Sequence, residues 1–285
     1  MINIFYRTSH LQGRMSGPMK VIQNLCQSLE DCGVKFAVNK EEYKHNFFLH
    51  WDPYQVEVYK TIKNKESLLV GPQMWPFAPE FKELTEYGKI VAPSWWVKDK
   101  LEKYFNVTKC LTWPVAIYRP EIHYSVIQND CLIYHKNRSE EDLEYIKLLL
   151  SRRRLTYTQL QYGSYTQDNF RQALASVKFC VIIDNTESQG IAIQEMMAAR
   201  KPLFVWDTPV WDHMGQEYAV PASSVPYWDY MCGEKVSDKN ELELYLDIFL
   251  QAINCYTPDK YVNKTLSPKA TVKILTDHFL SLIHI

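Results

Sequence analysis

Short hydrophobic runs alternate along the chain with stretches in which hydrophobic residues recur at helical spacing. In the first part of the chain, the runs predict strands at 2–6, 34–38, 46–51, 68–70, 89–92 and 111–113. The helical spacing predicts helices at 18–32, 56–63 and 94–105. This strand–helix–strand succession is typical of a parallel sheet with helices on its faces.

Residues 114–129 show no periodicity, and we interpret them as a linker before a second series of the same kind. The strands predicted in that series are 131–134, 156–162, 179–183 and 203–206. Its predicted helices are 140–150, 166–176, 191–200, 240–254 and 268–282. The pattern therefore predicts an α/β protein of two Rossmann-like βα domains facing a central cleft, since such sheets bind ligands at the carboxyl ends of their strands.

Composition narrows the class of protein. The net charge of −1 provides no basic field for nucleic acid or an anionic membrane. No hydrophobic run approaches the ~20 residues that span a bilayer, and the first residues have no signal-peptide pattern. The 7 cysteines are scattered without a Cys-x-x-Cys pair, which indicates free thiols in a reducing compartment. We therefore expect a cytoplasmic protein without a transmembrane segment.

One segment carries the most chemical information. The hydrophobic run 179–183 ends at Asp184, a polar turn with Gly190 follows, and a helical pattern begins at Ile191. A helix start offers unpaired N–H groups and a positive dipole end to an anion, and Gly190 has no Cβ to keep a phosphate away. Glu187 and Glu195 stand about 12 Å apart along such a helix, which rises ~1.5 Å per residue. They are therefore suited to bind the two ends of one extended, polyhydroxylated diphosphate.

The stretch from Glu187 to Pro202, with Glu187, Gly190 and Glu195, resembles the E-x7-E region of GT-B nucleotide-sugar glycosyltransferases, family 4 in particular. Three other segments resemble further parts of this family in the same order: 16–33 with Ser16-Gly17-Pro18, 90–97, and Tyr162-Gly163-Ser164-Tyr165. The resemblance spans both halves of the chain, which is shorter than typical members.

The resemblance implies an acceptor-binding domain at 1–118, with a helix at about 268–285 packing back on it, and a nucleotide-sugar-binding domain at 119–267. It implies that Glu187 touches the hydroxyls of the donor sugar and that Glu195 holds the ribose. The remaining donor contacts would come from backbone amides and from a turn beside the base: Ser188, Gln189, Gly190, Gly163, Ser164 and Tyr165.

This chain differs from the family at the two positions that usually carry positively charged side chains. Members usually carry an Arg, and a Lys five positions later, after the first strand of the second domain; here Lys136 and Glu141 stand at those positions, with Arg138 between them. Negative charge builds up on a departing nucleoside diphosphate in the transition state and needs a nearby positive charge. We therefore predict Lys136 as the catalytic cation and Arg138 as the second candidate. A solvated basic loop is the alternative for each.

On the acceptor side, the resemblance assigns the loop from Gly13 to Gly17 to the neighbourhood of the diphosphate and acceptor. Many members have a His near the acceptor sugar where this chain has Gly71-Pro72-Gln73. The candidate polar groups in this region are Ser16, His10, His50 and Gln73. A buried structural histidine is the alternative for His50.

Several other classes of site have no motif here. The chain contains no Asp-x-Asp pair for a divalent cation on a diphosphate, no P-loop and no Gly-x-Gly-x-x-Gly dinucleotide motif. We therefore expect no cofactor and no metal at the site.

These patterns and the resemblance predict a hexosyl- or pentosyltransferase that moves a sugar from a UDP- or GDP-linked donor to a hydroxyl of a glycan or other acceptor. The resemblance implies retention of anomeric configuration. Two alternatives stay open: a non-catalytic GT-B module that binds nucleotide or a partner protein, and a sugar-nucleotide epimerase of the same architecture. The expected partners are a nucleotide sugar and a glycan or glycosylated acceptor, not nucleic acid, and peripheral membrane contact is left open.

Overall fold

The computed structural model describes residues 1–7, 16–40, 44–49, 58, 60–62, 67–72, 88–104, 107–108, 110–123, 126–211 and 220–281. The chain divides into two compact units, Met1–Ala116 with Thr265–Ile285, and Ile117–Lys264. We call them unit 1 and unit 2. The domain limits that we predict, 118/119 and 267/268, lie close to the limits of these units; the binding function of each domain stays a prediction.

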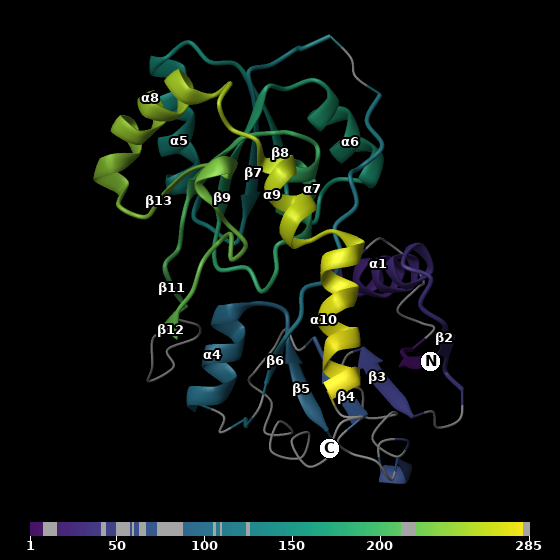
Figure 1. The fold of residues 1–285 in the computed structure, drawn as a ribbon. Helices are drawn as coiled ribbons and strands as arrows, with labels where there is room; N and C mark the ends of the chain where they lie inside the picture. Colours follow the sequence, from purple (N-terminus) through teal and green to yellow (C-terminus); the bar gives the residue numbers. More distant parts are fainter. Residues whose placement is uncertain are drawn as a thin grey trace. The chain divides into compact units, whose positions relative to one another are not determined.

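Within the described residues, unit 1 is built on a parallel sheet of six strands in the order β2-β1-β3-β4-β5-β6 (Figure 1). The strands are β1 (Ile2–Phe5), β2 (Phe36–Val38), β3 (His45–Leu49), β4 (Leu68–Gly71), β5 (Lys89–Ala92) and β6 (Leu111–Thr112). The helices are α1 (Gly17–Asp31), α4 (Trp95–Tyr104) and α10 (Pro268–Ser281).

The returning helix α10 belongs to unit 1 and packs beside α1 (Figure 1). The indole Nε1 of Trp113, which is fully buried, donates to the carbonyl oxygen of Thr271 on α10 at 3.1 Å. Leu275 and Phe279 of the same helix are buried in the unit. A hydrogen bond inside an apolar contact fixes both the position and the rotation of the helix.

Unit 2 contains a parallel five-stranded sheet in the order β13-β10-β9-β7-β8 and a short antiparallel pair, β11 with β12. The strands are β7 (Cys131–Lys136), β8 (Tyr157–Gln161), β9 (Phe179–Asp184), β10 (Leu203–Trp206), β11 (Val210–Trp211), β12 (Val220–Pro221) and β13 (Gly233–Val236). The helices are α5 (Glu140–Arg152), α6 (Gln167–Ala175), α7 (Ile191–Ala198), α8 (Leu242–Ala252) and α9 (Pro258–Thr265), with 3-10 turns at Tyr230–Cys232 and Lys239–Glu241.

The core of unit 2 explains why β9 is a continuous hydrophobic run. Every residue of β9 is buried, as expected for a central parallel strand with helices on both faces. Hydrophobic side chains of α5 and α8 pack on one face of the sheet, while α6 lies on its other side (Figure 1). This packing sets the carboxyl ends of β7, β9 and β10 next to one another.

The α/β fold class is confirmed by these two parallel sheets with helices. Several elements of unit 2 lie where we predicted none, among them β11, β12, β13 and α9. Ser94 directly precedes α4, and its backbone carbonyl accepts from Lys98 N at 3.1 Å, while its buried Oγ has no hydrogen-bond partner.

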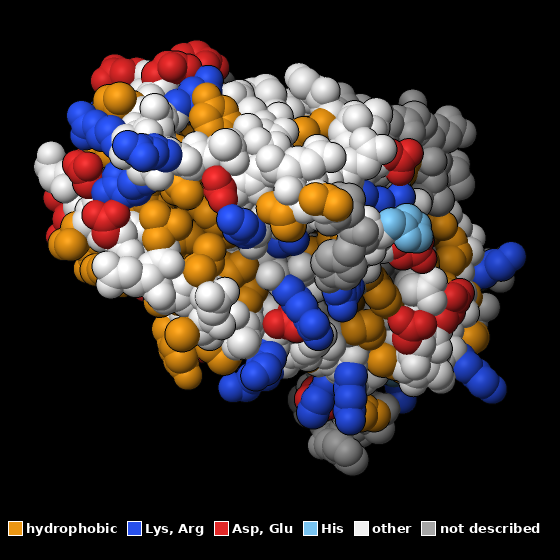
Figure 2. All heavy atoms as spheres, turned by 90° about the horizontal axis from the view of Figure 1, so that it is seen from above, with side chains coloured by type: hydrophobic (Ala, Val, Ile, Leu, Met, Phe, Trp, Pro, Cys, Tyr) orange, Lys and Arg blue, Asp and Glu red, His pale blue; other side chains and the backbone are white. Residues whose placement is uncertain are grey.

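No helix in the described ranges is long and apolar enough to cross a lipid bilayer. Acidic and basic side chains are interspersed over the face shown in Figure 2, with hydrophobic side chains between them. That face therefore carries no extended surface of a single charge sign, in agreement with the net charge of −1.

Candidate functional site

Two charged side chains that are far apart in the sequence meet at the carboxyl edge of the unit 2 sheet. Lys136 ends β7, and Glu187 lies in the turn that follows β9. The Lys136 ammonium donates to the Glu187 carboxylate, and each of these side chains is only 13% exposed. Two residues that we predict at the site are therefore in contact, and their roles there stay predictions.

The surroundings of Lys136 keep its side chain charged. Its Nζ lies 3.9 Å from Asp184 Oδ2 and 4.5 Å from the centre of the Tyr162 ring. Burial alone would lower the pKa of the ammonium, but the carboxylates of Glu187 and Asp184 outweigh burial and leave that pKa raised. A permanently protonated ammonium therefore lies at this edge of the sheet.

The turn after β9 has a defined conformation. The backbone N–H of Glu187 donates to the carbonyl of Ser223 at 3.0 Å, which ties the turn to the segment after β12. Gly190 adopts a left-handed conformation (φ 81°), and no side chain caps the start of α7. The Gln194 amide donates to the carbonyl of Gln189 at 2.6 Å. The backbone amides at the start of α7 therefore follow directly after Glu187, as the resemblance implies.

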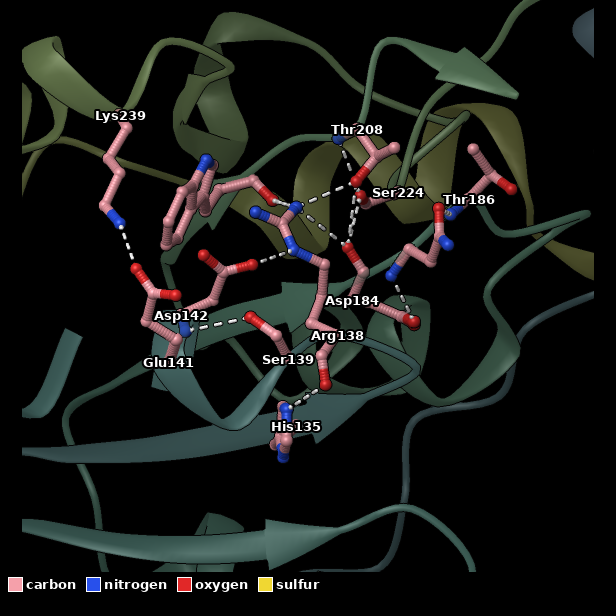
Figure 3. Close-up of polar contacts among 12 residues, drawn as sticks. His135, Arg138, Ser139, Glu141, Asp142, Asp184, Thr186, Thr208, Ser224 and Lys239 are labelled. Carbon is pink, nitrogen blue, oxygen red and sulfur yellow. Dashed lines mark hydrogen bonds and ion pairs between the residues drawn. The ribbon is translucent and has the colours of Figure 1, made fainter. Parts of the chain in front are cut away.

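Arg138, our second candidate for the cation, is held by its neighbours (Figure 3). Its guanidinium stacks on Trp206 at 4.4 Å, and its Nε donates to Asp142 Oδ2 at 3.0 Å. Its Nη1 donates to Thr208 Oγ1 at 2.8 Å and lies 3.5 Å from the carbonyl oxygens of Asp184 and Trp206. These contacts brace the ends of β9 and β10, and a direct contact of Arg138 with phosphate stays a prediction.

The predicted base-side turn lies next to the charged pair. Gly163 has a left-handed conformation, and its neighbour Tyr162 supplies the ring near Lys136. The Tyr165 hydroxyl donates to that of Tyr134 at 3.4 Å. Burial raises the pKa of Tyr165, and the negative charge of Glu195 on α7 raises it further. The second predicted carboxylate therefore lies near the same group of side chains.

A hollow of about 840 Å³ opens beside this turn. Ser164 and Tyr165 line it together with polar residues of α6, β8 and the segment 121–129. Neither Lys136 nor Glu187 lines the hollow. The hollow is therefore lined by the turn at Ser164 and Tyr165 and not by the charged pair.

The predicted acceptor-side residues fall in unit 1. Ser16 is the N-cap of α1 and accepts from Met19 N at 3.3 Å, and Gly17 is the first residue of that helix. His10, Gly13, His50 and Gln73 lie outside the described residues.

Our sequence reasoning did not assign a function to Asp184, although it noted that a strand ends there. The structure shows it fully buried and within 3.9 Å of Lys136. The signal in the sequence is an acid that ends an otherwise hydrophobic run. Within the described ranges, no group of three or more His, Cys, Asp or Glu is arranged to hold a metal ion.

No protein-family model matches the chain, and no curated protein matches it. Solved structures do. The chain is similar to TarM of S. aureus, crystallised with UDP and α-GlcNAc-glycerol, at 12% identity and a TM-score of 0.58. That match covers 91% of this chain and 58% of TarM, so the chain spans little more than half of that relative.

Two further structures have similar scores. Sucrose-phosphate synthase from Thermosynechococcus elongatus matches at 9% identity and a TM-score of 0.58, over 99% of both chains. The GtfA/B complex matches at 11% identity and a TM-score of 0.56, over 94% of this chain and 60% of that one. At these identities the likeness concerns the fold, and this chain has the fold of the GT-B glycosyltransferases.

Proposed function

We propose that this protein is a glycosyltransferase that moves a sugar from a nucleoside diphosphate sugar to a hydroxyl of a glycan or other acceptor. The observation that carries the proposal is the contact of Lys136 with Glu187 at the carboxyl edge of the unit 2 sheet, directly before the uncapped start of α7. This arrangement offers a cation, a carboxylate and backbone amides at one edge of the sheet. A nucleoside diphosphate sugar requires these three kinds of group.

In the proposed reaction, the bond between the anomeric carbon and the diphosphate oxygen breaks, and the acceptor oxygen forms the new bond to that carbon. The electron pair of the broken bond leaves with the diphosphate, and Lys136 stabilises the charge that develops there. The acceptor proton passes to the departing diphosphate. No nucleophile from the protein is needed, and the reaction retains configuration without a metal.

Glu187 and Glu195 serve binding in this proposal. Glu187 accepts hydrogen bonds from the donor sugar hydroxyls, and Glu195, near Tyr165, accepts from the ribose diol. Donor binding exchanges part of the contact between Lys136 and Glu187 for contacts with phosphate and sugar. The proposed donor is UDP- or GDP-linked. We also propose a cytoplasmic location, which is supported by the 7 cysteines, all of them free thiols.

The proposal is tested by isothermal titration with UDP- and GDP-sugars and by transfer of a radiolabelled sugar, both with a chelator present. We expect binding, and release of labelled sugar to an acceptor or to water. Glu195→Ala should weaken binding of the donor and of the free nucleoside diphosphate equally, because both carry the ribose. Binding that is unchanged in this variant would contradict the ribose contact, and binding without any turnover would favour a non-catalytic module.

A further inference from the structure

Asp184 is a carboxyl group buried inside unit 2 that shares the Lys136 ammonium with Glu187. It ends β9, its exposure is 0%, and its Oδ2 accepts no hydrogen bond from an N–H or O–H group. Its Oδ1 accepts from the N–H of Asn185 at 2.7 Å. A carboxylate ion in this position would lack most of the solvation that it has in water.

Ionisable groups from β7 and from the turns that follow β7 and β9 surround Asp184. On β7, the Lys136 ammonium lies 3.9 Å from its Oδ2, and the Lys136 side chain is itself in contact with Glu187. Asp184 and Glu187 therefore lie against the same ammonium, and the charge of Glu187 adds to burial in raising the pKa of Asp184. The other ionisable groups nearby are Tyr134, whose hydroxyl is buried, and Arg138, which contacts the Asp184 backbone.

Two ionised carboxyl groups against one ammonium leave an excess negative charge in a buried site unless one of them holds a proton. We propose that Asp184 and Glu187 hold one proton between them, so that together with the Lys136 ammonium they form a neutral group beside the diphosphate site. Two carboxyl groups that share one ammonium in a buried site cannot both ionise without a large cost, and the fully buried Asp184 is the member on which the proton is favoured. Asp184 is therefore a positioning residue that acts through Glu187 and Lys136.

This inference rests on the proposed function for its consequence. With one shared proton, the charges of Asp184, Glu187 and Lys136 sum to zero. Without the proton they sum to −1, and the extra negative charge lies beside the ammonium that is proposed to bind the diphosphate. Neutral Asp184 thus keeps the attraction of Lys136 available to the phosphates.

The sign of the pH dependence follows. Burial, and next the charge of Glu187, hold the pKa of Asp184 well above its ordinary value of 3.8. The shared proton is bound below the raised pKa and is lost as pH rises through it. Lys136, whose pKa is raised, and Tyr134, whose pKa burial raises, do not titrate in the same range. Diphosphate affinity should therefore fall as the pH rises.

The first experiment needs no ligand. Infrared difference spectra at neutral pH should show a protonated-carboxyl band in the wild-type protein that is missing in Asp184→Asn. Asp168→Asn, the same substitution at an acid whose side chain is 80% exposed, should keep the band. A spectrum of Asp184→Asn that matches the wild type would overturn the shared proton.

The second experiment measures binding of UDP and GDP between acidic and alkaline buffers. Wild-type affinity should fall on the order of tenfold as the pair loses its proton, since that is the effect of one nearby charge across a partly screened site. Asp184→Asn, a neutral isostere, should bind like the acidic wild type and lose this dependence. The phosphate of the ligand also titrates, but it does so equally with every variant. The difference in pH dependence between the wild type and Asp184→Asn therefore reports on Asp184 and Glu187 alone.

Two results would contradict the inference: a wild-type pH dependence that persists in Asp184→Asn, or a folded Asp184→Asn protein that binds tenfold more weakly at every pH. The latter would mean that Asp184 acts as an anion on Lys136. Failure of the wild type to bind either nucleotide would count against the proposed function instead. The infrared comparison would still decide the shared proton in that case.

Discussion

Lys136 and Asp184 are register partners in the unit 2 sheet, and they are the last residues of β7 and β9. Their side chains lie on the same face, because partners across a parallel pair point the same way, and Nζ is 3.9 Å from Oδ2. The carboxyl edge of the sheet therefore sets the position of the ammonium. Four predictions follow from this site and from the unit 1 core.

Lys136→Ala should reduce sugar transfer by about 10²–10³-fold, because a preorganised charge at the leaving group is lost. Lys136→Arg should recover part of the rate. Steady-state kinetics with a radiolabelled donor provides the measurement. Lys147→Ala, which removes a lysine on α5 paired with Glu144, is the matched control and should leave the rate unchanged. A Lys136→Ala enzyme with the wild-type rate would show that the cation lies elsewhere.

Arg138→Met should lower the free energy of unfolding by about 2–4 kcal/mol, since the carbonyls of the buried residues Asp184 and Trp206 and the partly exposed carboxylate of Asp142 lose their donor. Arg138→Lys should recover little of it, because an ammonium cannot reproduce the planar donors that reach Asp142 and Thr208. Urea unfolding gives the values. Arg171→Met, at an exposed arginine of α6, should stay within about 0.5 kcal/mol of the wild type. If Arg138→Met is equally stable but inactive, Arg138 contacts substrate directly.

Gly190→Ala should cost about 1–2 kcal/mol of stability, because its φ of 81° is a left-handed conformation that a Cβ disfavours. The new Cβ would meet Glu187 Cβ at an ordinary 3.6 Å, so strain and not a clash is the cause. Nucleotide affinity should also fall, because the amides of the turn shift. Gly33→Ala has the same kind of strain (φ 67°) at the end of α1 and should leave affinity unchanged. Calorimetry measures nucleotide affinity in both variants. If Gly190→Ala binds as tightly as Gly33→Ala, the turn does not contribute to nucleotide binding.

Stability should decline on acidification through His278 of α10. Burial, and next the positive charge of Lys89, lower the pKa of this histidine to about 4, and its Nε2 has no hydrogen-bond partner. The unfolded chain, with an ordinary pKa of 6.5, then binds the proton first, so stability is complete above that value and falls as the pH drops toward 4. His278→Gln should flatten the decline in urea titrations at several pH values. An unchanged slope would assign the acid sensitivity to another group.

The parts of the fold that sequence predicts are those whose signal is local. The run of β9 reads as a buried parallel strand because all its residues are hydrophobic up to Asp184. β13 was not predicted, because Glu234 and Lys235 interrupt its hydrophobic pattern at the edge of the sheet. The contacts of Asp184 could not be predicted either, because Lys136, Thr208 and Ser224 come from separate parts of the chain. An acid at the end of a strand is usually solvated, and only the fold shows that this one is not.

One carbonyl oxygen, that of Asp184, lies within hydrogen-bond distance of Arg138 Nη1, Thr208 Oγ1 and Ser224 Oγ. Three separate loops therefore meet at a single atom of the main chain (Figure 3). An engineer who lengthens any one of these loops to admit a bulkier sugar would loosen the other two. Redesign of donor preference would therefore have to replace the three loops together, with all three taken from one related protein.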